Sequence, residues 1–191
     1  MNFLAHIYLS GDNEELLIGN FIADFVKGSK KDLYPVGITR GIELHRAIDN
    51  FTDHHQITAE SKSRLYPRHH KYAPVIVDIY YDHFLAKNFS LYYDIALVDY
   101  VAQCYEVIQK HYDMLPEGVK QFFPYMVEKN WLLNYSTVEG IGRTLKGLSS
   151  RVAFPNKMNE ATIDLENEYS LFEDEFSRFF PQLINFVHQK R

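Results

Sequence analysis

The segment APVIVDIYYDHFLAKNF, residues 73–89, decides the fold class of this chain. Its content of Val, Ile and Tyr favours a β-strand. However, the segment is longer than most strands, and it has no turn signal between Pro74 and Phe89. Its repeat of three apolar residues followed by one Asp is typical of a buried helix with a narrow polar stripe, and Pro74 stands where a helix start is expected. The segment therefore predicts a helix, and with it an all-α protein.

The first half of the chain carries signals for further helices. Gly11 and Gly28 follow the apolar stretches NFLAHIYLS and EELLIGNFIADFVKG, where glycine often ends a helix. Pro35 can open a helix that runs through residues 44–55, and Pro116 stands at another expected helix start.

The second half continues the helical pattern. Ser136 and Glu139 have the spacing of a capping box before GIGRTLKGLSSRV, and RVAFPNKMN is predicted to be a loop. Residues 159–188 form a long amphipathic segment that Pro181 is expected to break or kink. No repeat, low-complexity tract or linker interrupts the chain, so we predict one compact helical bundle spanning residues 1–191 as a single domain.

Composition limits the classes of protein. With 46% hydrophobic and 24% charged residues, the chain is expected to be globular. Cys104 is the only cysteine, which excludes an internal disulfide and a thiolate zinc site and fits a reducing compartment. The first residues lack the basic region of a signal peptide, and no uncharged apolar run is long enough to span a membrane. We expect a cytoplasmic protein without membrane attachment, and the net charge of −5 argues against nonspecific nucleic-acid binding.

Residues able to bind a metal or move a proton concentrate in LHRAIDNFTDHH, residues 44–55. Positions four apart lie on one face of a helix, so this stretch forms a polar stripe beside apolar neighbours. Three other apolar segments carry residues of the same kind. The candidates are His6, Asp24, the stripe His45, Asp49 and Asp53, and the equally spaced pair Asp78 and Asp82.

Each candidate also has a structural interpretation. A single His on an apolar face is more often a satisfied core residue, Asp24 could pair with Arg40 or Arg46, and Asp78 and Asp82 could form a solvated stripe. The set as a whole is harder to explain in this way, because buried, unpaired carboxylates are costly and repel one another. A shared divalent cation removes both costs, so we predict a metal site.

The ligand types indicate which metal and chemistry to expect. Carboxylates with a few imidazoles and no thiolate suit Mn²⁺, Mg²⁺ or Fe²⁺ better than structural zinc. Such sites activate water and bind phosphoryl groups, and the chain lacks the HExxH, GxxxxGK[ST] and GxSxG motifs of other enzymes. Arg46 could reach a phosphate at the edge of the site, with Arg143 and Arg151 as other candidates, although surface salt bridges would also explain them. We interpret His54 and His55 as the end of the helix, not as ligands.

A basic run lies outside these candidates. KSRLYPRHHK, residues 62–71, has no acidic residue, whereas residues 160–175 are rich in Asp and Glu. The run could be an ordinary solvated surface or a docking patch for an acidic partner. The cations of this predicted patch are Lys62, Arg64, Arg68 and Lys71.

Four motifs, MNFLAHIYLS, GNFIADFVKG, GIELHRAIDNFTD and DIYYDHFLAKNF, occur in order over residues 1–89. Together they resemble the acyl carrier protein phosphodiesterases, and NWLLNY and GLSSR are similar to later segments of that family. The resemblance implies an all-helical fold related distantly to the HD-type metal phosphohydrolases. It also implies removal of the 4′-phosphopantetheine arm from holo-acyl carrier protein, an acidic partner, with a divalent cation that is typically manganese.

The resemblance also bears on individual residues. It places Asp24, His45, Arg46 and Asp49 among the expected catalytic residues, and these positions together with Asp53 fall on the family's motifs. The expected metal ligands are His6, Asp24, His45, Asp49, Asp78 and Asp82. The adjacent His-Asp pair of ordinary HD proteins is absent, and His45 with Asp49 would be a spaced substitute. A phosphohydrolase of small nucleotides and a noncatalytic helical binding module remain the alternative functions.

Overall fold

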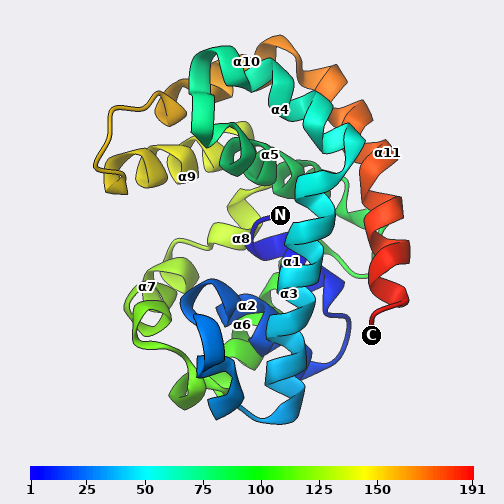
Figure 1. The fold of residues 1–191 in the computed structure, drawn as a ribbon, viewed down its shortest axis with the longest axis vertical. Coiled ribbons are helices and arrows are strands. Elements are labelled where there is room, and N and C mark those ends of the chain that lie inside the picture. Colours follow the sequence, from blue (N-terminus) through cyan, green and yellow to red (C-terminus); the bar gives the residue numbers. More distant parts are fainter.

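The computed structural model describes residues 1–191 and contains helices without any strand, which confirms the predicted all-α class (Figure 1). Short 3₁₀ turns connect several of the α-helices. The α-helices are α1 (Phe3–Leu9), α2 (Glu14–Ile22), α3 (Val36–His54), α4 (Gln56–His69), α5 (Ala73–Lys87), α6 (Leu97–Lys110), α7 (Glu117–Glu128), α8 (Trp131–Asn134), α9 (Val138–Arg151), α10 (Ala161–Asn167) and α11 (Tyr169–His188).

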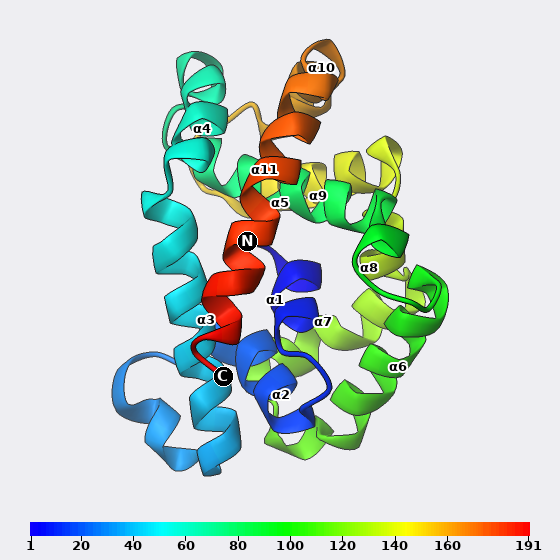
Figure 2. The same cartoon turned by 90° about the vertical axis from the view of Figure 1, so that its right-hand side faces the viewer.

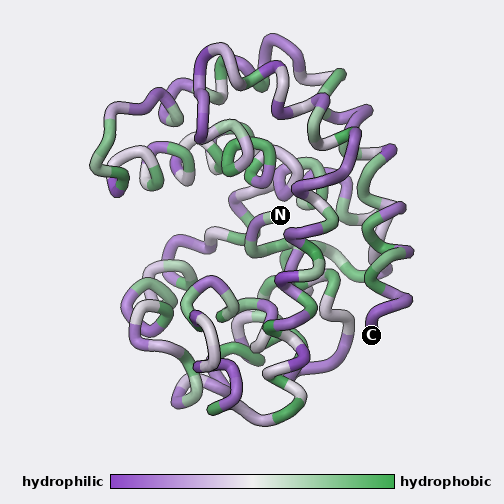
Figure 3. The backbone as a smooth tube through the Cα atoms, viewed as in Figure 1, coloured by the Kyte–Doolittle hydropathy of each residue, from purple (hydrophilic) through white to green (hydrophobic).

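Helix α5, the segment whose type was ambiguous, lies in the upper half of the molecule as drawn, between α4 and α1 (Figures 1 and 2). It packs against α1, α4, α9 and α11. Its Val, Ile and Tyr side chains are accommodated in a helix because neighbours surround it on nearly all sides, and tertiary burial outweighs intrinsic propensity. By contrast, α11 turns hydrophilic residues outward and hydrophobic residues inward (Figure 3).

One contiguous cluster of 49 buried apolar residues forms the core. Aromatic side chains supply its largest members, including Tyr80, Phe84, Phe176 and Phe180. These rings bury large apolar areas and pack edge to face or stacked, as Phe176 and Phe180 do with centroids 5.0 Å apart. No helix of this fold combines the length and the apolar character that crossing a bilayer requires.

Two glycines let α2 and α3 cross in backbone contact. A Cβ atom on Gly19 would lie 2.0 Å from the carbonyl oxygen of Ile38, and one on Gly41 would lie 2.4 Å from the carbonyl oxygen of Leu16. Only glycine permits this separation at both positions. The close crossing matters for the site because it brings Asn20 on α2 beside His45 on α3.

Several predicted helix boundaries are confirmed. Gly11 follows α1 with a φ of +61°, Pro35 and Pro116 precede the first residues of α3 and α7, and Pro74 lies in the first turn of α5. The predicted loop between α9 and the turn Met158–Glu160 is also present.

Three other boundaries differ from the prediction. Helix α2 ends at Ile22 and passes into a 3₁₀ turn, Ala23–Phe25, well before Gly28. Thr137, not Ser136, caps α9 by accepting a hydrogen bond from the Gly140 amide at 3.0 Å. The C-terminal segment breaks at Glu168, between α10 and α11, whereas Pro181 lies inside α11.

Candidate active site

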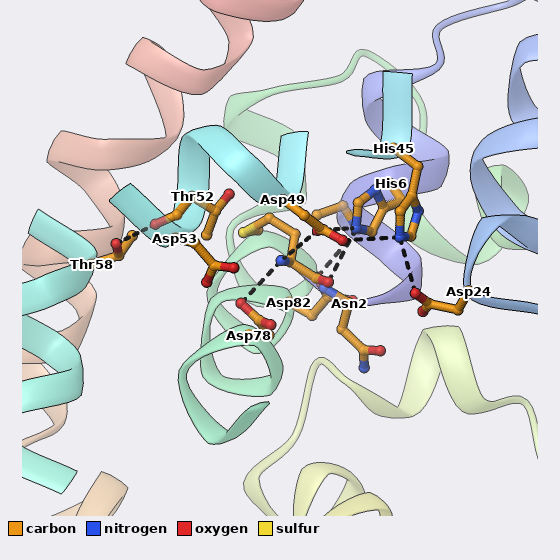
Figure 4. Close-up of polar contacts among 12 residues, drawn as sticks. Asn2, His6, Asp24, His45, Asp49, Thr52, Asp53, Thr58, Asp78 and Asp82 are labelled. Carbon is orange, nitrogen blue, oxygen red and sulfur yellow. Dashed lines mark hydrogen bonds and ion pairs between the residues drawn. The ribbon is translucent and has the colours of Figure 1, made fainter. Parts of the chain in front are cut away.

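Three ligand-type side chains, His6 on α1 and His45 and Asp49 on α3, converge on one point (Figure 4). Asp49 reaches both imidazoles: its Oδ1 lies 3.1 Å from His6 Nε2, and its Oδ2 lies 3.0 Å from His45 Nε2. The two rings stack with their centroids 3.9 Å apart. Both imidazoles are buried, whereas the Asp49 side chain is 39% exposed, so this His–Asp cluster is reached from one side only.

Asn20, buried on α2, orients both rings. His45 Nδ1 lies 2.8 Å from the Asn20 backbone oxygen, and because a carbonyl oxygen can only accept, Nδ1 carries the proton. His6 Nδ1 lies 2.8 Å from Asn20 Oδ1, and the Asn20 amide group is fixed in this orientation because its nitrogen donates to the His6 carbonyl at 2.7 Å. In the neutral rings, both Nε2 lone pairs therefore point toward Asp49, as in many metal-binding histidines.

The Nε2 atoms of the cluster consequently face oxygen acceptors. His6 Nε2 lies 3.1 Å from the Met1 carbonyl oxygen as well as near Asp49. His45 Nε2 is close to two carboxylates, but neither is aligned with it, and it is a buried nitrogen without a hydrogen-bond partner. A buried imidazole nitrogen without a hydrogen-bond partner is unfavourable unless a proton or a cation joins it.

The pKa values of the cluster residues also favour a bound positive charge. Burial and the neighbouring His45 lower the pKa of His6 to about 4. Burial opposes protonation of His45, but Asp24 and Asp49 raise its pKa to about 9. Against the effect of its own burial, Asp49 is held at a pKa well below the ordinary value by His45 and His6. Two imidazole nitrogens and an ionised carboxylate form a donor set that fits a divalent cation, which would take the place of the His45 proton.

Asp24 and Asp78 flank the cluster. Asp24, on the 3₁₀ turn after α2, is 70% exposed and places Oδ1 3.3 Å from His45 Nε2, which lowers the pKa of Asp24. Asp78, on α5, places Oδ1 3.0 Å from the Met1 amino nitrogen, which is itself 3.6 Å from Asp49 Oδ1. Burial raises the pKa of Asp78, so the two flanking carboxyl groups differ in their affinity for a proton.

Asp82 occupies a different environment from Asp78, one turn earlier on α5. The sequence predicts both as metal ligands, but Asp82 is fully buried and faces the N-terminus of α1. Its oxygens accept from the backbone amides of Leu4 at 2.8 Å and of Asn2 and Ala5 at 3.3 Å each. No side chain of α1 caps that helix, so Asp82 provides the cap from a neighbouring helix.

Two further sequence candidates also lie outside the His–Asp cluster. Asp53 continues the stripe of α3 but pairs with Lys62 Nζ at 3.0 Å. Arg46 donates from Nη2 to the Val26 carbonyl at 3.1 Å, which fixes it behind the turn that carries Asp24. His54, as expected for the end of a helix, has Nδ1 2.8 Å from the Asn50 carbonyl oxygen.

A cleft of about 680 Å³ opens beside the cluster. Its lining includes Asp24 and Asp78 from the site and three cations from other helices, Lys129, Arg143 and Arg151. Clefts of roughly 300–1,000 Å³ are typical of small-molecule and cofactor sites. Because Asp24 and Asp78 line the cleft and flank the His–Asp cluster, the cleft and the cluster are adjacent.

Sequence reasoning missed two parts of this site. Asn20 was not identified, although a polar residue inside the apolar run LLIGNFI is a detectable signal. The aromatic wall of the cleft, made by Phe25, Phe122 and Trp131, depends on contacts between distant segments, with Phe122 and Trp131 stacked at a centroid distance of 5.9 Å. Such contacts have no local sequence pattern.

The predicted docking patch, on α4 and the 3₁₀ turn His70–Tyr72 that follows it, is largely neutralised within the chain. Arg64 pairs with Glu168 and Glu175, and Arg68 pairs with Glu160 and Asp164. We call these six residues the α4 ion-pair network. Lys62 pairs with Asp53, and Lys71 alone has no acidic partner, its Nζ lying 4.4 Å from the Phe154 ring centroid.

His and Asp side chains gathered from separate helices beside a cleft are typical of the active site of a hydrolytic enzyme, here on an all-helical fold. Comparisons with known proteins specify this class. The family model for acyl carrier protein phosphodiesterase matches residues 1–183. The chain therefore belongs to the acyl carrier protein phosphodiesterase family, and it is a phosphoric diester hydrolase.

Individual relatives match over almost their whole length. Acyl carrier protein phosphodiesterase from Klebsiella pneumoniae (strain 342) is 32% identical, with both chains fully covered. The enzyme of the same name from Photorhabdus laumondii is 29% identical over all of this chain and 96% of the relative, and that from Escherichia coli O157:H7 is 31% identical over 96% of each chain. No solved structure matches the chain.

Proposed function

We propose that the chain hydrolyses the phosphodiester that links 4′-phosphopantetheine to the serine of holo-acyl carrier protein, leaving the apo protein. The observation that carries this proposal is the convergence of His6, His45 and Asp49 on one point beside a cleft, where the buried Nε2 of His45 lacks a hydrogen-bond partner. Family membership supports the carrier protein as the substrate, since the relatives carry the name acyl carrier protein phosphodiesterase.

We propose a divalent cation as cofactor, with Mn²⁺ preferred and Mg²⁺ or Fe²⁺ as the other candidates. His6, His45 and Asp49 would hold it, with Asp24 beside His45 and with Asp78 linked to Asp49 through the Met1 amino group. When bound, the cation supplies stabilisation of the negative charge on the phosphoryl group and activation of water. Asn20 keeps both imidazoles in the orientation that this binding requires.

The two flanking carboxyl groups divide the proton transfers. Asp24 is exposed at the cleft wall and has a lowered pKa, so in its ionised form it accepts the proton of the attacking water. Asp78 also lines the cleft and has a raised pKa, so it retains a proton more readily and donates it to the departing serine oxygen. The bond between phosphorus and the serine oxygen breaks, and the arm leaves as free 4′-phosphopantetheine.

The decisive experiment measures release of phosphopantetheine from holo-acyl carrier protein by protein stripped of metal. We expect no release in excess chelator, recovery on adding Mn²⁺, and no comparable hydrolysis of small nucleotides. Full release in chelator would overturn the metal, and turnover of nucleotides but not of the carrier protein would favour the alternative phosphohydrolase. Absence of hydrolysis with every divalent ion, together with an unchanged melting temperature, would favour a binding module.

A further inference from the structure

The face of α9 that lines the cleft has an unusual composition. The lining residues Gly140, Arg143, Gly147 and Arg151 recur at intervals of three or four, which places them on one side of the helix. Gly140 packs against the Asn134 carbonyl, Gly147 leaves open space, and the two arginines are exposed. The face therefore combines free space at Gly147 with two positive charges, which stand about 12 Å apart along the helix axis.

These two arginines differ from those of the α4 ion-pair network. Arg143 and Arg151 form no ion pair with any acidic side chain of the chain, whereas Arg64 and Arg68 each contact two. The only acids that line the cleft are Asp24 and Asp78, which belong to the candidate active site. The positive charge of the α9 face is thus available to a partner.

Space beside the helix is also unoccupied. A Cβ atom added to Gly147 would meet no heavy atom within 4 Å, although Gly147 lines the cleft. The aromatic wall of Phe25, Phe122 and Trp131 contributes apolar surface to the same cleft, with the Phe25 and Phe122 ring centroids 5.5 Å apart. Apolar walls with a few polar groups are typical of sites for a flexible small-molecule chain.

We infer that this cleft binds the substrate in two parts. The flexible, amide-containing arm lies in the cleft against the aromatic wall and beside Gly147, with its phosphodiester at the His–Asp cluster. Arg143 and Arg151 bind carboxylates on the surface of the acidic carrier protein that bears the arm. The inference rests on the proposed function, because it assigns the substrate of that function to a surface.

The two parts predict different binding behaviour, which can be measured without catalysis. Dissociation constants are determined for holo- and apo-acyl carrier protein with metal-stripped enzyme, at low and high salt. We expect the holo form to bind more tightly than the apo form to the wild type, since only the holo form fills the cleft. Arg143→Glu and Arg151→Glu should weaken both forms several-fold, most strongly at low salt.

Gly147→Phe tests the arm alone. The added ring fills the space beside Gly147, so the preference for the holo form should disappear while the apo form binds as before. Lys146 provides matched controls, because it is exposed on the same helix and does not line the cleft. Lys146→Glu should weaken binding less than Arg143→Glu, and Lys146→Phe should keep the holo preference. Melting curves establish that each variant is folded.

The outcomes separate this inference from the proposed function. If the wild type releases phosphopantetheine but none of the α9 variants differs from its Lys146 control, the inference is overturned and the function stands. Equal binding of holo and apo forms by the wild type likewise overturns the place assigned to the arm. If binding follows the expected pattern but no divalent ion supports hydrolysis, the surface is supported and the proposed reaction is not.

Discussion

Two groups of charged residues, the His–Asp cluster and the α4 ion-pair network, make an instructive comparison. In the network, each guanidinium contacts two carboxylates, and the buried Glu175 also accepts from Ser61 Oγ at 2.6 Å. In the cluster, the buried Nε2 of His45 has no hydrogen-bond partner, and the only cation beside Asp49 other than the imidazoles is the Met1 amino group, 3.6 Å away. The network is complete within the chain, and the cluster is completed only by a proton or a cation.

The comparison shows that density of charge in the sequence does not locate a functional site. The basic run of residues 62–71 has four cations and no acid, yet three of the four, Lys62, Arg64 and Arg68, pair with acidic residues within the chain. The isolated Arg143 and Arg151 lie at the cleft and have no acidic partner. A functional site is located better by charged residues that have no oppositely charged partner in the fold. Which residues these are depends on contacts between distant segments.

The largest expected effect comes from removing the carboxylate at the centre of the cluster. Asp49→Ala should lower turnover of holo-acyl carrier protein by more than roughly 100-fold, since both imidazoles lose their shared anionic partner and the site loses a metal ligand. The fold should persist, because the side chain is partly exposed and lies outside the apolar core. Turnover is measured at saturating Mn²⁺ beside a melting curve. Turnover near that of the wild type would show that Asp49 is not a catalytic residue.

Asp82→Ala should instead affect stability. Loss of its oxygens leaves two backbone amides of α1 and that of the preceding Asn2 without this acceptor, which should cost about 2–3 kcal/mol of unfolding free energy. The folded fraction should retain turnover much better than Asp49→Ala. Denaturant unfolding and turnover per folded molecule are the measurements. A stable variant without activity would indicate that Asp82 is a metal ligand, as the sequence predicts.

The same residue predicts a pH dependence of stability. Burial raises the pKa of Asp82 from 3.8 to about 7, so between these values the folded protein binds a proton that the unfolded chain has released. The stability contributed by this proton is present below about pH 4 and is lost as the pH rises to about 7. This component of the pH dependence should be missing from Asp82→Ala.

Asp78 and Asp82 also show how far sequence reasoning reaches. Their spacing, and the apolar residues between them, correctly predict a buried helix. The spacing predicts a shared role as well, but one side chain faces the amino group near the cluster and the other caps α1. Which neighbour each residue meets is decided by the packing of α1 against α5, and no local pattern encodes it.

The site residues on α3 were more predictable for a physical reason. His45 and Asp49 lie four residues apart on one helix, so helical geometry alone brings them together, and their separation of 3.0 Å follows from that spacing. His6 and Asp24 were identified by type and apolar surroundings, but their contacts depend on the crossing of helices. The contribution of Asn20 depends on the close approach of Gly19 and Gly41, which only the structure reveals.

Metal binding should be linked to proton release, an effect smaller than loss of a ligand. His45 has a pKa of about 9 without metal, so at pH 7.5 it is protonated and must lose this proton when its Nε2 binds a cation. Calorimetry in buffers of different ionisation enthalpy should therefore report close to one proton released per Mn²⁺. Apparent affinity should rise about tenfold per pH unit up to about pH 9 and then level off. Affinity independent of pH would exclude His45 as a ligand.

The smallest expected effect concerns the α4 ion-pair network, whose charges are already paired within the chain. Arg68→Gln removes a charge whose nitrogens contact Asp164 at 3.0 Å and Glu160, so this charge is not free to bind a carrier protein. Its KM for holo-acyl carrier protein should equal that of the wild type at low salt, where electrostatic docking is strongest. Lys71→Gln is the matched comparison, because Lys71 belongs to the same predicted patch but has no acidic partner. An increase in KM for Lys71→Gln alone would leave one docking contact in the turn after α4, with the network remaining structural. A several-fold increase for Arg68→Gln would show that the partner displaces the internal ion pairs, and the α4 surface would then have to be counted with α9 as part of the docking site.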